Sequence, residues 1–167
     1  MLITKTEIYK FSIPMVPFTI ATGTMHFAQN TLIKVYTSEG IIGVGECSAF
    51  PMIVGETQNT CFEMAKDFAA LWKGKLALEI DDRLQELDLF TAGNTTIKSA
   101  FDMALYDIAA KHANLPLYKF LGGSKKEIES DLTIGIGSPD EMAQQAIDFL
   151  KRKVRIIKIK LGKAPKD

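Results

Sequence analysis

Hydrophobic and polar residues alternate in several short stretches near the start of the chain, as expected for half-buried β-strands. Residues 3–11 and 31–37 are rich in β-branched and aromatic side chains, and residues 41–47 follow after a Ser-Glu-Gly turn. The second and third stretches therefore predict a β-hairpin.

Two segments beside these strands predict loops. Pro14 and Pro17 interrupt the first strand, and residues 19–29 are rich in Thr, Gly and Ala with little periodicity. Residues 48–55 contain a further proline and a glycine. We expect both segments to lie at the surface and the first to be mobile.

A spacing of three to four residues between apolar positions begins at residue 57 and predicts three helices, at residues 57–73, 80–90 and 95–113. Asn114 and Pro116 end the third helix. That helix has the most continuous apolar stripe, formed by Ile97, Ala100, Phe101, Ala104, Leu105, Ile108 and Ala109.

A strand–helix–strand pattern follows the Leu-Gly-Gly sequence at residues 121–123. Residues 131–136 predict a strand, and a helix starts at Ser138, with a proline at the first helical position and a glutamate at the third. It runs to about residue 151 and leads into a strand at residues 154–162. Such βαβ units build parallel sheets, which need cover on both faces.

One βαβ unit cannot supply that cover. The chain of 167 residues is therefore expected to be truncated, with a complete α+β domain at 1–123 and the opening of a second domain at 124–167.

Lys158 and Lys160 alternate with Ile157, Ile159 and Leu161 in the last strand. Alternate side chains of a strand share a face, so both ammonium groups are expected to point the same way. If that face is exposed to solvent, the two lysines say little about function. If it is enclosed, each charge and the burial itself lower a lysine pKa, which suits a lysine for abstracting protons near neutral pH. We favour the enclosed alternative, because active sites gather at the carboxyl ends of parallel barrel strands.

Composition and charge narrow the function classes. Lys plus Arg and Asp plus Glu both number 20, so the overall charge does not point to nucleic acid or to a membrane surface. Only two cysteines occur, which predicts a reducing compartment and no disulfide framework. No signal sequence and no run of about 20 apolar residues is evident, so a cytoplasmic protein is expected.

Other motifs favour structural roles. The Gly-Val-Gly run at residues 43–45 lacks a third glycine and a following helix, so it indicates a strand with close backbone packing rather than a nucleotide loop. His26 and His112 are too isolated for a metal site, although His26, in a predicted loop, is a candidate for contact with a ligand. Asp102 and Asp107 are five residues apart on one helix and are interpreted as surface or packing acids.

The succession of elements and three short motifs resemble a known family. The motifs are the run Ser-Ala-Phe-Asp-Met-Ala-Leu-Tyr-Asp at 99–107, Pro-Leu-Tyr at 116–118 followed by Leu-Gly-Gly, and Lys-Ile-Lys-Leu-Gly at 158–162. They are similar to the enolase superfamily, in its muconate-lactonizing-enzyme subgroup, and most similar to dipeptide epimerases of the L-Ala-D/L-Glu type. The resemblance covers essentially the whole chain, and its Lys-x-Lys motif is the most specific part.

The resemblance implies an α+β capping domain whose two loops close over the substrate, followed by the first βαβ unit of a modified TIM barrel. Lys160 matches the base that removes the α-proton, Lys158 matches its partner that holds the carboxylate, and Thr133 matches a substrate-contacting position. The implied cofactor is Mg²⁺, with ligands and a second lysine expected beyond Asp167. No metal ligand is expected in this chain, and the chain by itself is expected to be inactive.

One position departs from the resemblance. Epimerases of the Ala-Glu type carry an arginine in the first capping loop, where this chain has Gly23. Its neighbours, including Met25 and His26, supply no fixed cation. An apolar second residue of the dipeptide is therefore expected, in contact with side chains such as Met25 and, from the second loop, Ile53.

Three alternatives stay open. One is another reaction of the same subgroup: cycloisomerisation, o-succinylbenzoate synthesis or N-acylamino acid racemisation. Another is nucleic-acid binding by residues 151–167, which hold eight Lys or Arg but no aromatic side chain for stacking. The third is a non-catalytic fragment kept for interaction with a partner, and homo-oligomer formation is also left open.

Overall fold

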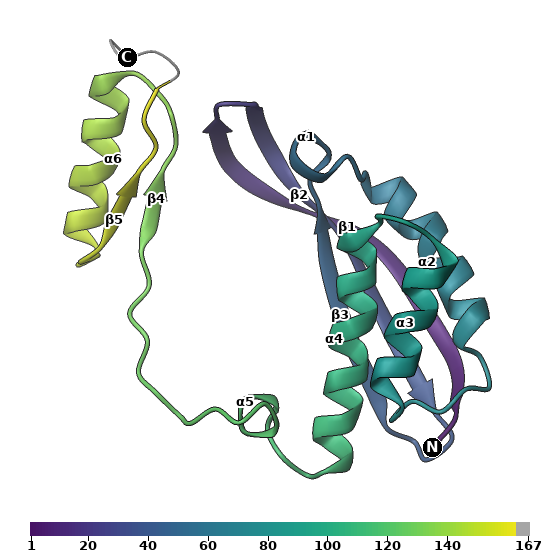
Figure 1. The fold of residues 1–167 in the computed structure, drawn as a ribbon. Helices are drawn as coiled ribbons and strands as arrows, with labels where there is room; N and C mark the ends of the chain where they lie inside the picture. The colour runs from purple at the N-terminus through teal and green to yellow at the C-terminus, as the bar shows by residue number, and fades with distance from the viewer. Residues whose placement is uncertain (163–167) are drawn as a thin grey trace. The chain divides into compact units, whose positions relative to one another are not determined.

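The computed structural model describes residues 1–162, which form two compact units. The first unit comprises residues 1–13 and 28–125, and the second comprises residues 14–27 and those from 126 onward. The elements are labelled in Figure 1. The strands are β1 (Ile3–Ile20), β2 (Gly23–Thr37), β3 (Ile42–Ala49), β4 (Leu132–Ile134) and β5 (Ile157–Ile159), and the helices are α1 (Pro51–Val54), α2 (Gln58–Trp72), α3 (Ile80–Phe90), α4 (Thr95–His112), α5 (Leu117–Phe120) and α6 (Pro139–Lys151).

The first unit is a three-stranded sheet in the order β1-β2-β3, with α2, α3 and α4 against one face (Figure 1). Strands β2 and β3 are antiparallel, with Ile33 opposite Gly45 and Val35 opposite Gly43. The turn between them includes Gly40 at φ 81°, a conformation that glycine adopts without steric cost. The predicted hairpin is confirmed.

The predicted loop at residues 19–29 is wrong. Strand β1 continues to Ile20 and β2 starts at Gly23, so the segment forms the tip of a long hairpin. Pro14 and Pro17 are tolerated within β1 because it is an edge strand of the sheet, where a missing N–H need not break a ladder on both sides. Because β-branched and aromatic residues also favour extended backbone, the hairpin persists through the prolines.

The three predicted helices are confirmed as α2, α3 and α4. All seven residues of the predicted apolar stripe are buried on α4, and Asn114 after its end takes a left-handed φ of 55°. The rings of Phe68 and Trp72 on α2 meet Phe101 edge to face, with centroids 5.4 and 5.0 Å away. Both cysteines are free and buried.

Helix α4 lies in very close contact with β3, as the Gly-Val-Gly run predicted. A Cβ added at Gly45 would lie 1.7 Å from the carbonyl oxygen of Ala100, and one at Gly43 would lie 2.2 Å from that of Ala104. No side chain fits at these distances. The two glycines and the two facing alanines therefore allow the helix backbone to approach the strand backbone directly.

The outer edge of β3 is covered by two side chains of the same helix. Asp107 accepts a 2.9 Å hydrogen bond from the backbone N–H of Val44, and Lys111 donates to the carbonyl of Ile42 at 2.7 Å and to Asp107 at 2.7 Å. Asp107 is thus a packing acid, as its sequence context indicated. Covering these edge groups hinders pairing with another strand.

The loop predicted at residues 48–55 is partly helical. Strand β3 extends to Ala49, and α1 forms one turn with a proline at its start and Gly55 in a left-handed conformation at its end. The short α5 was not predicted either. None of the helices within residues 1–162 combines the length and apolarity needed to cross a membrane.

The second unit contains the predicted βαβ arrangement. Strands β4 and β5 pair in parallel, with Thr133 opposite Lys158 and Ile134 opposite Ile159. Helix α6 begins with the predicted capping box between Ser138 and Glu141. The architecture is thus an α+β domain followed by a βαβ unit. The domain division at residue 123 stays a prediction, and residues 163–167 of the second predicted domain lie outside the described residues.

We expect Gly45→Ala to lower the free energy of unfolding by about 1–3 kcal/mol or more, because the new methyl group would displace α4 from β3. Val44→Ala, on the opposite face of the same strand, should cost less than about 1 kcal/mol. Urea unfolding followed by the fluorescence of Trp72, which is fully buried, measures both. Equal destabilisation by the two substitutions would contradict the close-packing argument.

Candidate active site

Parallel pairing of β4 with β5 positions the lysine pair. The N–H of Lys160 donates to the carbonyl of Ile134 at 3.0 Å, which extends the pairing beyond the last residue of β5. Because alternate residues of a strand share a face and paired residues lie side by side, Thr133, Lys158 and Lys160 lie on one face of this sheet. Ile134 lies on the other face and is buried. The expected grouping of Thr133 with the two lysines is therefore consistent with the strand register.

The tip of the β1–β2 hairpin contacts the carboxyl end of β4. The carbonyl of Thr19 accepts a 3.1 Å hydrogen bond from the N–H of Ile136. A Cβ at Gly135 would lie 3.2 Å from the nitrogen and 3.3 Å from the oxygen of Thr19, and 3.8 Å from the ring of Phe18. The hairpin tip, residues 14–27, is called the flap below. It belongs to the same compact unit as Lys160.

Three of the expected substrate-contacting residues lie on the flap. Gly23 opens β2 with φ 152°, a value that side-chain-bearing residues rarely adopt. Met25 is half-buried and His26 is exposed on the alternate face of the strand. Residues 14–27 contain no Lys, Arg, Asp or Glu. The flap thus offers a mainly apolar surface with one imidazole.

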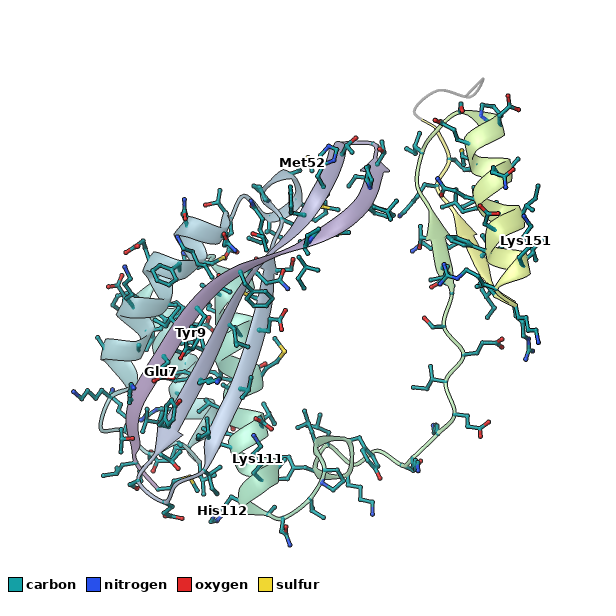
Figure 2. All side chains as sticks on the ribbon, turned by 180° about the vertical axis from the view of Figure 1, so that it is seen from behind. Glu7, Tyr9, Met52, Lys111, His112 and Lys151 are labelled. Carbon is teal, nitrogen blue, oxygen red and sulfur yellow. The ribbon has the colours of Figure 1, made fainter. Side chains whose placement is uncertain are left out.

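Ile53, the remaining expected contact, lies on α1 in the other unit. Its side chain is 60% exposed, and Met52 and Val54 beside it are also exposed; Figure 2 labels Met52 on this short helix. Three consecutive apolar residues in one exposed helical turn suit a contact with an apolar group. Its substrate contact stays a prediction.

The enclosure expected for the lysine pair is not provided by residues 1–162. Lys158 is exposed and Lys160 is half-buried. The sheet that carries them has two strands in the described part of the chain, and a barrel interior needs a closed ring of strands. Enclosure of the pair stays a prediction.

A charged cluster in the first unit occupies the sheet face that the helices leave uncovered (Figure 2). The carboxylate of Glu7 accepts hydrogen bonds from the ammonium of Lys5 at 2.5 Å and from the hydroxyl groups of Tyr9 and Tyr36 at 2.7 Å each. These donors lower the pKa of Glu7 to about 2 because they stabilise its charged form, with Lys5 the largest cause. Lys34 lies 5.7 Å above the ring of Tyr9. The carboxylate of Glu7 is thus hydrogen-bonded at both oxygens within the cluster, which is a structural reason for its depressed pKa.

No group of three or more His, Cys, Asp or Glu side chains in residues 1–162 is arranged to hold a metal ion.

Sequence reasoning missed the flap contact. Phe18 and Thr19 approach Gly135 and Ile136 mainly through backbone atoms. More than 100 residues separate the two segments, and a main-chain hydrogen bond leaves no signature in side-chain identity. The one available signal was Gly135 inside a strand-like run, because such a glycine often marks a close backbone approach.

The α+β domain, followed by a parallel βαβ unit that carries the paired lysines, is the arrangement of a capping domain at the N-terminal part of an enolase-type protein. The mandelate racemase/muconate lactonizing enzyme N-terminal domain family matches residues 3–122. The chain belongs to this family, a branch of the enolase superfamily.

Its relatives include dipeptide epimerases. The chain is 43% identical over 164 residues to the D-Ala-D/L-Ala epimerase of Cytophaga hutchinsonii, covering 97% of this chain and 45% of that protein. It is 31% identical over 170 residues to the L-Ala-D/L-Glu epimerase of Clostridium acetobutylicum, covering 99% and 47%.

A solved structure of one of these epimerases also matches almost the whole chain. The dipeptide epimerase from Cytophaga hutchinsonii, complexed with Mg and the dipeptide D-Ala-L-Val, matches with a TM-score of 0.97 and 41% identity, over 99% of this chain and 46% of that one. The chain thus spans about half the length of the curated relatives it matches.

We expect Gly135→Leu to push Thr19 away from Ile136, because even a Cβ at this position meets the flap backbone at 3.2 Å. Amide hydrogen exchange in residues 14–27 should then rise by roughly ten-fold, the loss of about one net hydrogen bond. Gly137→Ala is the control, since its nearest neighbour is the flexible carboxylate of Glu141 at 3.4 Å. Unchanged flap exchange in Gly135→Leu would mean that the contact is not maintained in solution.

Proposed function

We propose that the protein carrying this chain is a dipeptide epimerase that removes and returns the α-proton of one residue of its substrate. The observation that carries the proposal is the placement of Lys160, Lys158 and Thr133 on one sheet face, in the unit that also contains the flap. The 43% identity to the Cytophaga epimerase supports it.

In this proposal Lys160 is the base. Its unprotonated Nζ takes the proton from the α-carbon, and negative charge develops on the adjacent carboxylate or amide oxygen. Lys158, two residues away on the same face, places a cation beside that developing charge. The flap would exclude water and contact the side chain of the dipeptide.

We propose that the complete enzyme also uses Mg²⁺, as the Cytophaga neighbour is complexed with Mg. A bound Mg²⁺ supplies positive charge next to a reacting oxygen.

We further propose that the second residue of the preferred dipeptide is apolar. The flap holds no Lys or Arg, so an acidic side chain would be buried there without a partner, which costs several kcal/mol by order of magnitude. An apolar side chain against Met25 or Phe27 would instead gain roughly 1.5–3 kcal/mol. Valine is the second residue of the dipeptide in the Cytophaga complex.

Lys160→Ala is expected to lower α-proton exchange by about 10²–10⁴-fold, the contribution of a general base. Lys158→Ala should leave a weak but measurable rate, because it removes charge stabilisation and not the base. Exchange of L-Ala-L-Val in deuterium oxide, followed by NMR for each epimer, measures both. Lys151→Ala, an exposed position on α6, is the control. Normal exchange in Lys160→Ala would refute the assignment.

A library of L-Ala-L-Xaa dipeptides should give a kcat/KM for apolar Xaa at least about ten-fold above that for Glu, the equivalent of 1.4 kcal/mol. Gly23→Arg is expected to shift the ratio toward Glu, although its backbone conformation is unfavourable for a side chain. Gly23→Leu carries the same strain without charge and should not shift it. A preference for Ala-Glu over every apolar dipeptide would contradict the apolar specificity.

A further inference from the structure

Residues 56–58, here called the anchor segment, lead from the end of α1 into the first residue of α2 and contact two other parts of the first unit. Glu56 is buried, and its carboxylate accepts hydrogen bonds from the backbone N–H groups of Thr96 at 3.0 Å and Ile97 at 3.4 Å. The cap residue of α4, Asn94, makes no side-chain cap bond. Glu56 therefore caps α4 from 40 residues away in the chain.

The third residue of the anchor segment reaches the β1–β2 hairpin. The side-chain nitrogen of Gln58 donates to the carbonyl of Phe11 at 2.7 Å and to that of Asn30 at 2.9 Å. Both partners can only accept, which requires that the amide nitrogen and not the oxygen faces them. One side chain thus ties both strands of the hairpin to the start of α2.

The two carbonyls that Gln58 holds lie next to the boundary between the first unit and the flap. Phe11 lies two residues before Ile13, where the hairpin leaves the first unit to form the flap, and Asn30 lies two residues after Ala28, where the chain returns to it. Asn30 is further held by a hydrogen bond from its side-chain amide to Glu46 on β3. The base of the flap is therefore fixed from α2 on one side and from β3 on the other.

We propose that Gln58 is a positioning residue that clasps the base of the flap and ties it to the segment following α1. The two capping elements, the flap with Met25 and α1 with Ile53, then share one anchor, because Gly55 alone separates α1 from Glu56. The role in substrate binding rests on the proposed function, whereas the clasp rests on the contacts of Gln58. Loosening the flap should weaken dipeptide binding more than the chemical step.

Gln58→Glu tests the clasp with almost no change of shape. A carboxylate cannot donate and is repelled by both carbonyls. At the first position of α2 its negative charge favours the helix, so general unfolding is not expected. Hydrogen exchange of the whole protein should be roughly ten-fold faster in peptides spanning residues 12–29 and unchanged in α4. KM for L-Ala-L-Val should rise by a similar factor, with kcat changing less.

Two further variants serve as controls. Asn59→Ala removes only the exposed contact with the ammonium of Lys10 and should leave flap exchange unchanged. Gln58→Asn keeps the amide but is one methylene shorter, so it should reach at most one carbonyl and give an intermediate rate.

Unchanged flap exchange in Gln58→Glu would overturn the proposal, whatever the activity. Faster exchange in every peptide would also overturn it, because Gln58 would then support the whole unit and not the flap. Faster flap exchange in Gln58→Glu, combined with no epimerase activity in the unsubstituted protein, would support the role of Gln58 and reject the proposed function.

Discussion

The direct backbone approach of α4 to β3 is the constraint on which the first unit depends. Gly43 and Gly45 face the carbonyls of Ala104 and Ala100 at distances that exclude any side chain. Because the helix lies this close, Asp107 and Lys111 can reach the outer edge of β3. The same placement brings the ring of Phe101 to Phe68 and Trp72 of α2, so the helical layer is organised around one contact.

The start of α4 is capped by a residue that lies next to the contact holding the β1–β2 hairpin. The two N–H groups that Glu56 accepts belong to its first turn, and Glu56 is followed two residues later by Gln58, which holds both strands of the hairpin. Three consecutive residues thus make three different contacts: the Glu56 carboxylate caps the start of α4, Thr57 forms the capping box of α2, and the Gln58 side-chain amide holds the hairpin.

The second unit is organised differently. Its parallel pair is short, and several large apolar side chains beside it, such as Leu150, Ile159 and Leu161, are exposed. Buried sheets of this kind require cover on both faces. The relatives that the chain matches are about twice as long, and the lysine pair lies on the sheet face opposite the buried Ile134.

Local physical chemistry determined most elements from the sequence. Helical spacing predicted α2, α3 and α4, a capping box predicted the start of α6, and alternation predicted that Lys158 and Lys160 share a face, because each of these depends on residues within one or two turns of chain. The Gly-Val-Gly run also revealed close packing, although not its partner. Tertiary structure alone decided that the hairpin persists through Pro14 and Pro17, since that depends on β1 being an edge strand. It alone brought Thr19 to Ile136, Glu56 to α4 and Gln58 to Phe11. In each of these contacts at least one partner is a backbone group, which every residue carries, so side-chain identity could not reveal the pairing.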